Sequence, residues 1–518
     1  MKRNSTLHSQ LFTLILIFTL LACCFSACGE QTIIRPGEPV SRTDETANIS
    51  LTLNLGCSRD YSLPSPYDSD SDLDKSLVSL MYEPLYRLDD EFRAVPVLAK
   101  EISEPDAEGS MNVVVDTDRQ FSDGTYITAV DVVYSFRQAK NSSEYSAELS
   151  AFRSAEAKSL DTVLFSLNSY RVGAADALNF PVVQNATADD ENDLPIGTGM
   201  YAKMTHGASI LSLNPYYPGE KPYIKAINLV PVSDDASLVQ TLDTGLIDAY
   251  FDDFSAGTVI ETAGRTVFTP MPNLVYLGLN SEAYGLSDPA VRQAIGYSVN
   301  RRAIAMNAYE GTAKEAYTPF HPGWYRLKES GFDTSSLVLD FSRAARLMYG
   351  ADIDSDYSCR LLVYSGNGFK TAAARQIADD LAHIGIDVIV DEREWSEYTE
   401  ALGKGDYELY IGEVVTPACM DISPLLRGYH SLYGISDADT TDTAFAQFSR
   451  GSIDMSAFMD SFTGNSPFVP LVYRDGALYC SRSIAPAVDT DWHMPFKNIV
   501  EWHFVEPEYV SKEPETFY

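Results

Sequence analysis

The 518-residue chain is too long for one ordinary hydrophobic core, so two or three domains are expected. Its hydrophobic content of 45%, with 31 Tyr and 24 Phe, supports globular folding and excludes an intrinsically disordered protein. The net charge of −35 makes nucleic acid a poor partner, because few cations are available to neutralise phosphates. An acidic surface of this kind chiefly keeps a protein in solution.

The N-terminus has the pattern of an export signal. Lys2 and Arg3 precede an uncharged apolar run over residues 11–21, which is too short for a membrane span. Phe25-Ser-Ala-Cys28 then resembles a lipoprotein processing site, and Leu20-Leu-Ala-Cys23 is a competing one. Cys28 is preferred because polar chain follows it directly. We therefore expect a signal peptide over 1–27 and a lipid on Cys28; an ordinary secreted protein is the alternative.

The first folded elements follow a tether. Residues 28–48 lack an apolar period, so they predict a flexible link between lipid and domain. A half-buried strand is predicted where apolar and polar residues alternate, at Ile49, Leu51, Leu53 and Leu55, and Gly56 is expected to end it. An acidic, Ser-rich loop over 64–74 then leads to a helix predicted over 75–86.

The stretch from 111 to 136 predicts a strand, a turn and a capped helix. Apolar residues alternate at Met111, Val113 and Val115, and Asp123-Gly124 is typical of a turn. Thr128 and Asp131 have the spacing of a capping box. One buried helical face is predicted from the spacing of Ala129, Val132, Val133 and Phe136.

Later segments add backbone signals. Pro195-Ile-Gly-Thr-Gly-Met-Tyr201 predicts a tight turn where the backbone passes close to another segment. It is not a phosphate cradle, because no helix with the required Lys and Ser or Thr follows. Residues 273–280 predict a strand, and Asp288-Pro289 opens a helix, since proline at the first turn loses no hydrogen bond.

From Cys359 onward the pattern alternates between strand and helix, which implies a parallel sheet with helices on its faces. The predicted strands cover 360–364, 386–390 and 407–411, and the predicted helices cover 371–383 and 395–402. The turn over 365–368 has the position of an anion site at a helix N-terminus, but it lacks further glycines or a lysine, so a plain strand-to-helix turn is the preferred interpretation.

No enzyme or metal-binding motif is present, so neither catalysis nor a cofactor is expected. The sequence contains no His-Glu-x-x-His pair, no Gly-x-Ser-x-Gly elbow and no Walker loop, and its seven His are dispersed. Beyond Cys28 the cysteines are Cys57, Cys359, Cys419 and Cys480. Their wide spacing is unlike a disulfide framework or a zinc site, so buried free thiols are predicted.

Several segments together resemble one family. They are similar to marker segments of extracellular solute-binding proteins, family 5, which serve peptide and nickel ABC importers. The segments are Phe121-Ser-Asp-Gly-Thr125, the helix start at 128–135, the run 195–201, Leu213-Asn-Pro-Tyr-Tyr217 and the helix 291–301. Pro84, Met200 and Asn300 depart from the usual residues, and the chain is abbreviated between Gly434 and Gly464.

The resemblance implies an α/β fold of the two-lobed periplasmic-binding-protein type, with mixed sheets and an extra small domain. It implies discontinuous domains: 49–87 with 195–268 and 482–518, then 88–194, then 269–481. The implied protein is an extracytoplasmic monomer, anchored by lipid to the bacterial cell membrane, that delivers a small solute to an ABC permease. An oligopeptide is the first expectation for the solute. A nickel chelate, an opine-like compound or another cationic metabolite is an alternative, and so is a non-transporting sensor or adhesion protein with the same fold.

By the same resemblance, the ligand would lie between the loop around Asp70, Ser71 and Asp72, the aromatic Tyr145, and a segment comprising Gly412, Glu413, Val414 and Thr416, with Asp421 following a few residues later. Peptide binders of the family typically have tryptophan after the glycine and then an aspartate that pairs with the peptide amine. This chain has Glu413 and Thr416 there. We hypothesise that Glu413, Asp421 or an aspartate of 68–74 receives a cationic ligand group, because a buried charge needs an opposite partner. The alternative is that these acids are solvated loop residues.

Overall fold

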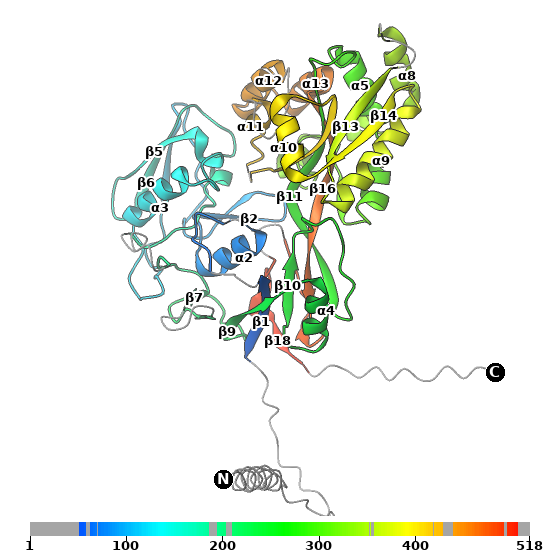
Figure 1. The fold of residues 1–518 in the computed structure, drawn as a ribbon. Coiled ribbons are helices and arrows are strands. Elements are labelled where there is room, and N and C mark those ends of the chain that lie inside the picture. The colour runs from blue at the N-terminus through cyan, green and yellow to red at the C-terminus, as the bar shows by residue number, and fades with distance from the viewer. Residues whose placement is uncertain are drawn as a thin grey trace, which may run out of the picture. The chain divides into compact units, whose positions relative to one another are not determined.

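A computed structural model describes residues 51–58, 63–69, 71–185, 194–203, 210–351, 353, 357–417, 419–427, 439–491 and 495–505 (Figure 1). These residues belong to one compact unit, residues 50–518, and the predicted signal, Cys28 and tether lie outside the described part. None of the described helices has the length and apolar character needed to cross a membrane.

A large mixed sheet dominates the described chain. Its strand order is β14-β13-β15-β11-β16-β10-β1-β9-β8-β7, with β12 also paired to β16. Two parallel groups, β9-β1-β10 and β14-β13-β15, are joined by the antiparallel strands β11 and β16. The strands are β1 (Thr52–Ser58), β7 (Tyr201–Lys203), β8 (Ile210–Leu213), β9 (Ala226–Val232), β10 (Ala249–Asp252), β11 (Arg265–Leu279), β12 (Ala313–Glu315), β13 (Ser358–Tyr364), β14 (Asp387–Arg393), β15 (Leu409–Val415) and β16 (Phe468–Cys480).

The two longest strands form a ribbon that runs through both parallel groups. Residues 265–270 of β11 pair with 475–480 of β16, and 274–278 pair with 468–473. The register shifts between Pro270 and Leu274, so residues 271–273 interrupt the pairing. The predicted domain boundary at 268/269 falls inside β11, and the three-domain division stays a prediction.

A separate three-stranded sheet, in the order β4-β6-β5, lies beside this structure (Figure 1). It consists of β4 (Ser110–Val114), β5 (Phe152–Ala157) and β6 (Thr162–Leu167) and packs with α3 (Ala129–Asn141). The predicted capped helix is confirmed, since the Asp131 carboxylate accepts from the Thr128 amide at 2.8 Å and the predicted face is buried. Phe136 of that face meets Phe152 and Phe165 edge-on, which favours aromatic packing.

The alternating segment after Cys359 is also confirmed. Helix α9 (Gly368–Ala382) links β13 to β14, and α10 (Trp395–Lys404) links β14 to β15. The other helices are α2 (Asp72–Met81), α4 (Asp235–Asp243), α5 (Pro289–Ser298), α6 (Arg301–Ala303), α7 (Tyr325–Glu329), α8 (Phe341–Gly350), α11 (Ser423–Leu426), α12 (Asp439–Ser449) and α13 (Met455–Asn465). Short helical turns are η1 (Glu148–Ala151), η2 (Ala174–Ala177), η3 (Ile304–Ala308), η4 (Thr334–Leu337) and η5 (Ile499–Glu501). Two-stranded pairs join β2 (Tyr86–Leu88) to β3 (Ala94–Pro96) and β17 (Ile484–Ala485) to β18 (His503–Phe504).

The buried apolar residues form two cores. One core contains β1, α2, α3 and the three-stranded sheet, and the other surrounds α5, α9, α13 and the strands next to them. The chain after β15 touches both, because Cys419 packs into the first core and Met420 and Ile422 into the second. The four cysteines beyond Cys28 are buried free thiols, as predicted.

Two local predictions are wrong and one is confirmed. Gly56 does not end β1, which continues to Ser58; it is a close approach, since a Cβ there would lie 2.9 Å from Tyr250 Cδ2. Helix α2 covers 72–81 rather than 75–86, because Ser71 caps it earlier and β2 takes up residue 86. The close approach predicted at 195–201 is confirmed, because a Cβ on Gly199 would lie 2.3 Å from the carbonyl carbon of Met81.

Candidate functional site

A buried ion pair connects the small sheet to the large one. Arg171, which follows β6, donates from Nη1 to Asp421 Oδ2 at 2.7 Å, and Asp421 follows β15. Arg171 Nη2 also donates to the Cys419 sulfur at 3.3 Å. The Arg171 and Asp421 side chains are only 11% and 6% exposed. We call Glu148, Arg171, Cys419 and Asp421 the junction cluster, because these residues meet where the two cores adjoin.

The predicted ligand carboxylate Asp421 has its partners within the chain. Its Oδ1 accepts from the Ser423 amide at 2.9 Å and from the Ser423 hydroxyl at 2.6 Å. Burial alone would raise the Asp421 pKa, but the Arg171 guanidinium and the Ser423 hydrogen bonds outweigh it and lower that pKa. Asp421 is therefore ionised and already neutralised by Arg171.

Glu148 is the unusual member of the junction cluster. It is buried at the start of η1, near the backbone of Cys419. Burial raises the Glu148 pKa to about 8, and the nearby Glu144 adds to this effect. Its Oε1 has no hydrogen-bond partner among the described residues. Glu148 is therefore mostly protonated at neutral pH and has one oxygen without a protein partner.

The loop before α2 lies near Tyr145, a residue close to Glu148 of the junction cluster. Tyr67 donates its hydroxyl to the Pro181 carbonyl at 3.1 Å, and its charge interaction with the half-buried Tyr145 indicates that the two side chains are near each other. Burial raises the Tyr145 pKa, with smaller effects from Glu144 and Glu148. Two residues along the loop, Ser69 is buried and its hydroxyl has no partner among the described residues.

The remaining loop residues have other surroundings. Ser71 caps α2, since its hydroxyl accepts from the Asp74 amide at 3.1 Å. Asp70 and the side chain of Asp72 lie outside the described part. The predicted role of Asp70, Ser71 and Asp72 in ligand binding stays a prediction.

Glu413 belongs to a second polar group rather than to the junction cluster. Its Oε1 accepts from Arg474 Nε at 2.6 Å and from Asn273 Nδ2 at 2.7 Å, and Lys370 Nζ lies 2.7 Å from Oε2. Burial alone would raise the Glu413 pKa, but Arg474 and Lys370 outweigh it and lower that pKa. These partners could not be predicted from neighbouring residues, because Arg474 is 61 residues away and comes from another strand.

The other residues predicted near Glu413 make strand contacts. The Thr416 amide and hydroxyl both donate to the Pro272 carbonyl, at 2.8 and 2.9 Å. A Cβ on Gly412 would lie 2.4 Å from Tyr276 Cζ, so glycine is required by packing. Val414 is partly buried against the core around β11. Their predicted ligand contacts stay predictions.

A mixed sheet joined by one long ribbon, two cores and a polar cluster at their junction define a bilobal α/β binding protein. Residues 93–432 match the family model described as bacterial extracellular solute-binding proteins, family 5 middle. The chain belongs to that family. The resemblance noted in the sequence is thereby confirmed, and extracytoplasmic solute binding is the function of the family.

Individual relatives agree with this assignment. The oligopeptide-binding protein AppA of Bacillus subtilis is 24% identical over 449 residues, which cover 79% of this chain and 80% of AppA. The crystal structure of the ABC transporter substrate-binding protein CtaP from Listeria monocytogenes matches with a TM-score of 0.73 and 18% identity, covering 88% of this chain and 99% of CtaP. NikZ of Campylobacter jejuni, solved in complex with Ni(L-His), matches with a TM-score of 0.64 and 20% identity, covering 88% and 99%. These structures confirm the fold.

Proposed function

We propose that this chain is the solute-capturing lipoprotein of an ABC importer and that it binds an oligopeptide at the junction cluster. Its similarity to the oligopeptide-binding AppA supports the ligand class. The proposed path is capture between segments 88–194 and 269–481, closure of the two around the solute, and delivery to the permease. The proposal includes export, a lipid on Cys28 and no catalytic step.

The observation that carries the proposal is the presence of buried polar atoms without protein partners, one of them in the junction cluster and one in the loop before α2. Ser69 Oγ and Glu148 Oε1 are both buried and have no hydrogen bond among the described residues. An unsatisfied buried polar group costs about 1–3 kcal/mol, so a partner from outside the chain is favoured. A peptide main chain offers alternating donors and acceptors, which suits a protonated Glu148 and a serine hydroxyl.

The two internal ion pairs bear on how a cationic ligand group is recognised. Asp421 is already paired with Arg171, and Glu413 is already paired with both Arg474 and Lys370. A ligand amine would have to displace these cations. Within the proposal, the acidic loop 68–74 is therefore the favoured source of a carboxylate for such an amine.

The first test is native mass spectrometry of protein purified from cells, to identify a retained ligand. Thermal unfolding with a peptide pool should then show a midpoint that rises with peptide concentration, because a ligand that binds the folded state stabilises it. A rise with nickel-histidine alone would replace the peptide with a chelate. No rise with any solute would favour the non-transporting protein.

A matched pair of variants tests the site. Glu148→Ala should weaken peptide binding at least about tenfold, whereas Glu156→Ala, at an exposed position of β5, should leave the dissociation constant unchanged. Equal affinities in the two variants would place the ligand elsewhere. Labelling with an alkyne fatty acid should be lost in Cys28→Ala and kept in Cys23→Ala.

A further inference from the structure

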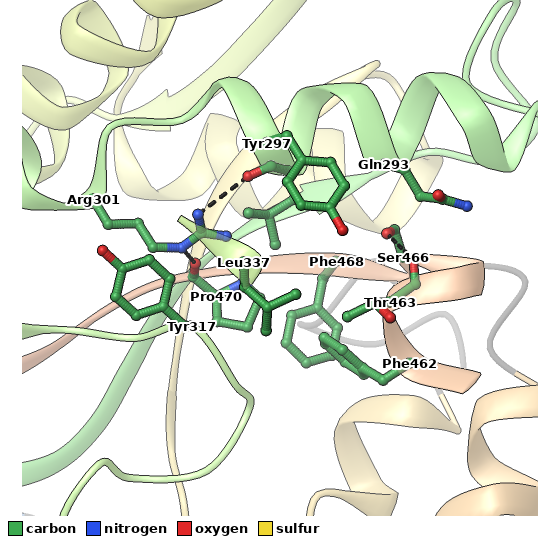
Figure 2. Close-up of a pocket in the computed structure, with 12 residues that line it drawn as sticks. Gln293, Tyr297, Arg301, Tyr317, Leu337, Phe462, Thr463, Ser466, Phe468 and Pro470 are labelled. Carbon is green, nitrogen blue, oxygen red and sulfur yellow. Dashed lines mark hydrogen bonds between the residues drawn. The ribbon is translucent and has the colours of Figure 1, made fainter. Parts of the chain in front are cut away.

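A small cavity lies within the α/β region of the chain, and none of the residues that line it belongs to the junction cluster. It is bounded by α5, the end of α13 and the start of β16, and Figure 2 shows the residues that line it. The cavity volume is about 40 Å³. Because a single water needs roughly 10–15 Å³ on this measure, the cavity has room for a few waters or one small organic ion.

The cavity contains a buried cation with unused donors. Arg301 is 5% exposed, and its Nε donates to the carbonyls of Ala316 and Pro470 at 2.9 and 2.7 Å. Its Nη1 donates to the Gly296 carbonyl at 3.1 Å. The remaining nitrogen, Nη2, has no hydrogen bond among the described residues and points into the cavity (Figure 2). Two N–H donors are therefore available to an occupant.

The positive charge on Arg301 is not paired by a nearby acid. Within the described residues no carboxylate lies at ion-pair distance from Arg301, and Glu315 acts on it only from farther away. Burial lowers the pKa of Arg301 to about 10, and Tyr317 and Glu315 offset this effect only in part. The guanidinium still remains charged at neutral pH, so an anion in the cavity would be stabilised.

The rest of the lining suits a small carboxylate. The Tyr297 hydroxyl has no hydrogen bond among the described residues and faces the same space, so it adds a further donor (Figure 2). Phe462 and Phe468 are buried and provide an apolar wall on the other side. A carboxylate directed at Arg301 would thus place its alkyl end against the phenyl rings.

The glycine that lines the cavity is a second, independent observation. Gly296 lies within α5, where glycine is less favourable than any residue except proline. A Cβ at this position would have only Val469 Cγ2 as a neighbour, at 3.8 Å, so packing permits a larger residue. The main effect of a side chain at 296 would be to fill the cavity.

We propose that the Arg301 cavity is a binding site for a small monocarboxylate of about the size of acetate, separate from the solute site at the junction cluster. Nη2 of Arg301 and the Tyr297 hydroxyl would hold the carboxylate oxygens. Phe462 and Phe468 would contact the alkyl group.

The test uses saturation-transfer NMR of the acetate methyl group with the full chain, at constant ionic strength set by sodium chloride. Arg301→Met is a poor variant, because three backbone carbonyls would lose their donor. Gly296→Leu fills the cavity and keeps Arg301, and Gly403→Leu, at an open position of α10, is the matched control. Tyr297→Phe removes one donor only. A cooperative thermal unfolding transition in acetate-free buffer shows that each variant is folded.

The expected result is a saturable methyl signal in the wild type and in Gly403→Leu. It should be reduced at least about fivefold in Gly296→Leu and more weakly in Tyr297→Phe. A signal of equal size in Gly296→Leu would place acetate elsewhere on the surface and overturn the proposal. A wild type without a saturable signal would overturn it as well.

Discussion

Removing the charge of Arg171 should destabilise the protein strongly, because Asp421 would remain buried and ionised without a counter-ion. Breaking a buried ion pair by removing one partner costs about 3–5 kcal/mol. The side chains in this pair are 11% and 6% exposed and 2.7 Å apart, so solvent screens their interaction weakly. We therefore expect Arg171→Met to lower the free energy of unfolding by about 3 kcal/mol, measured by urea titration.

A double-mutant cycle isolates the interaction from the loss of packing. Asp421→Asn keeps the shape of the side chain that Ser423 contacts and removes its charge. The double variant should recover part of the lost unfolding free energy, with a coupling energy above about 1.5 kcal/mol. The control is the pair Lys404 and Glu400, whose side chains are 67% and 63% exposed and which should couple by less than about 0.5 kcal/mol. A coupling energy at Arg171 and Asp421 no larger than at the control pair would refute the reasoning.

Three further predictions concern single residues. Glu148→Gln should become more stable relative to the wild type as pH rises from 5 to 8. The raised pKa of Glu148 means that the folded wild type still holds a proton which the unfolded state has released. The free energy of unfolding of the wild type therefore falls by up to about 1.4 kcal/mol per pH unit in this range. A flat difference in urea titrations across this range would contradict the burial of an ionisable Glu148. Glu413→Gln should lower the unfolding free energy by about 3 kcal/mol, because Glu413 neutralises two buried cations, and calorimetry should find an unchanged solute dissociation constant. Weaker solute binding with unchanged stability would instead assign Glu413 to the ligand site. Gly199→Ala should unfold at lower temperature because its Cβ would meet Met81 backbone, whereas Gly403→Ala should gain about 0.5–1 kcal/mol from helix propensity; equal midpoints would contradict the close approach.

Local structure was predictable where the signal is contained in neighbouring residues. The capped helix at Thr128 needs only a hydroxyl, a carboxylate three positions later and a periodic apolar face. The alternating elements after Cys359 follow from repeated spacing in the same way. The prediction for Gly56 was wrong because the role of this residue depends on Tyr250, which is nearly two hundred positions away and lies on the neighbouring strand β10.

The candidate site was predictable only in part, because its chemistry depends on pairs from distant segments. Asp421 and Glu413 were identified as acids of interest, but a single sequence does not reveal that Arg171 and Arg474 reach them. Glu148 was not identified at all. Its sequence context is an ordinary polar turn, and the raised pKa results from burial, which the backbone of Cys419 offsets only in part.

The interruption of the β11–β16 ribbon at residues 271–273 has a mechanical consequence. A ribbon whose ladder is interrupted at one place can change its bend there without breaking hydrogen bonds between β11 and β16, so torsional flexibility of the ribbon is concentrated at that place. Asn273 and Arg474 lie within this interruption, one on each strand, and both donate to the Glu413 carboxylate, so this one charge links the two strands there. The stiffness of the ribbon at this place then depends on the charge of Glu413. Neutralising that carboxylate would make the ribbon easier to bend without altering the length or sequence of either strand.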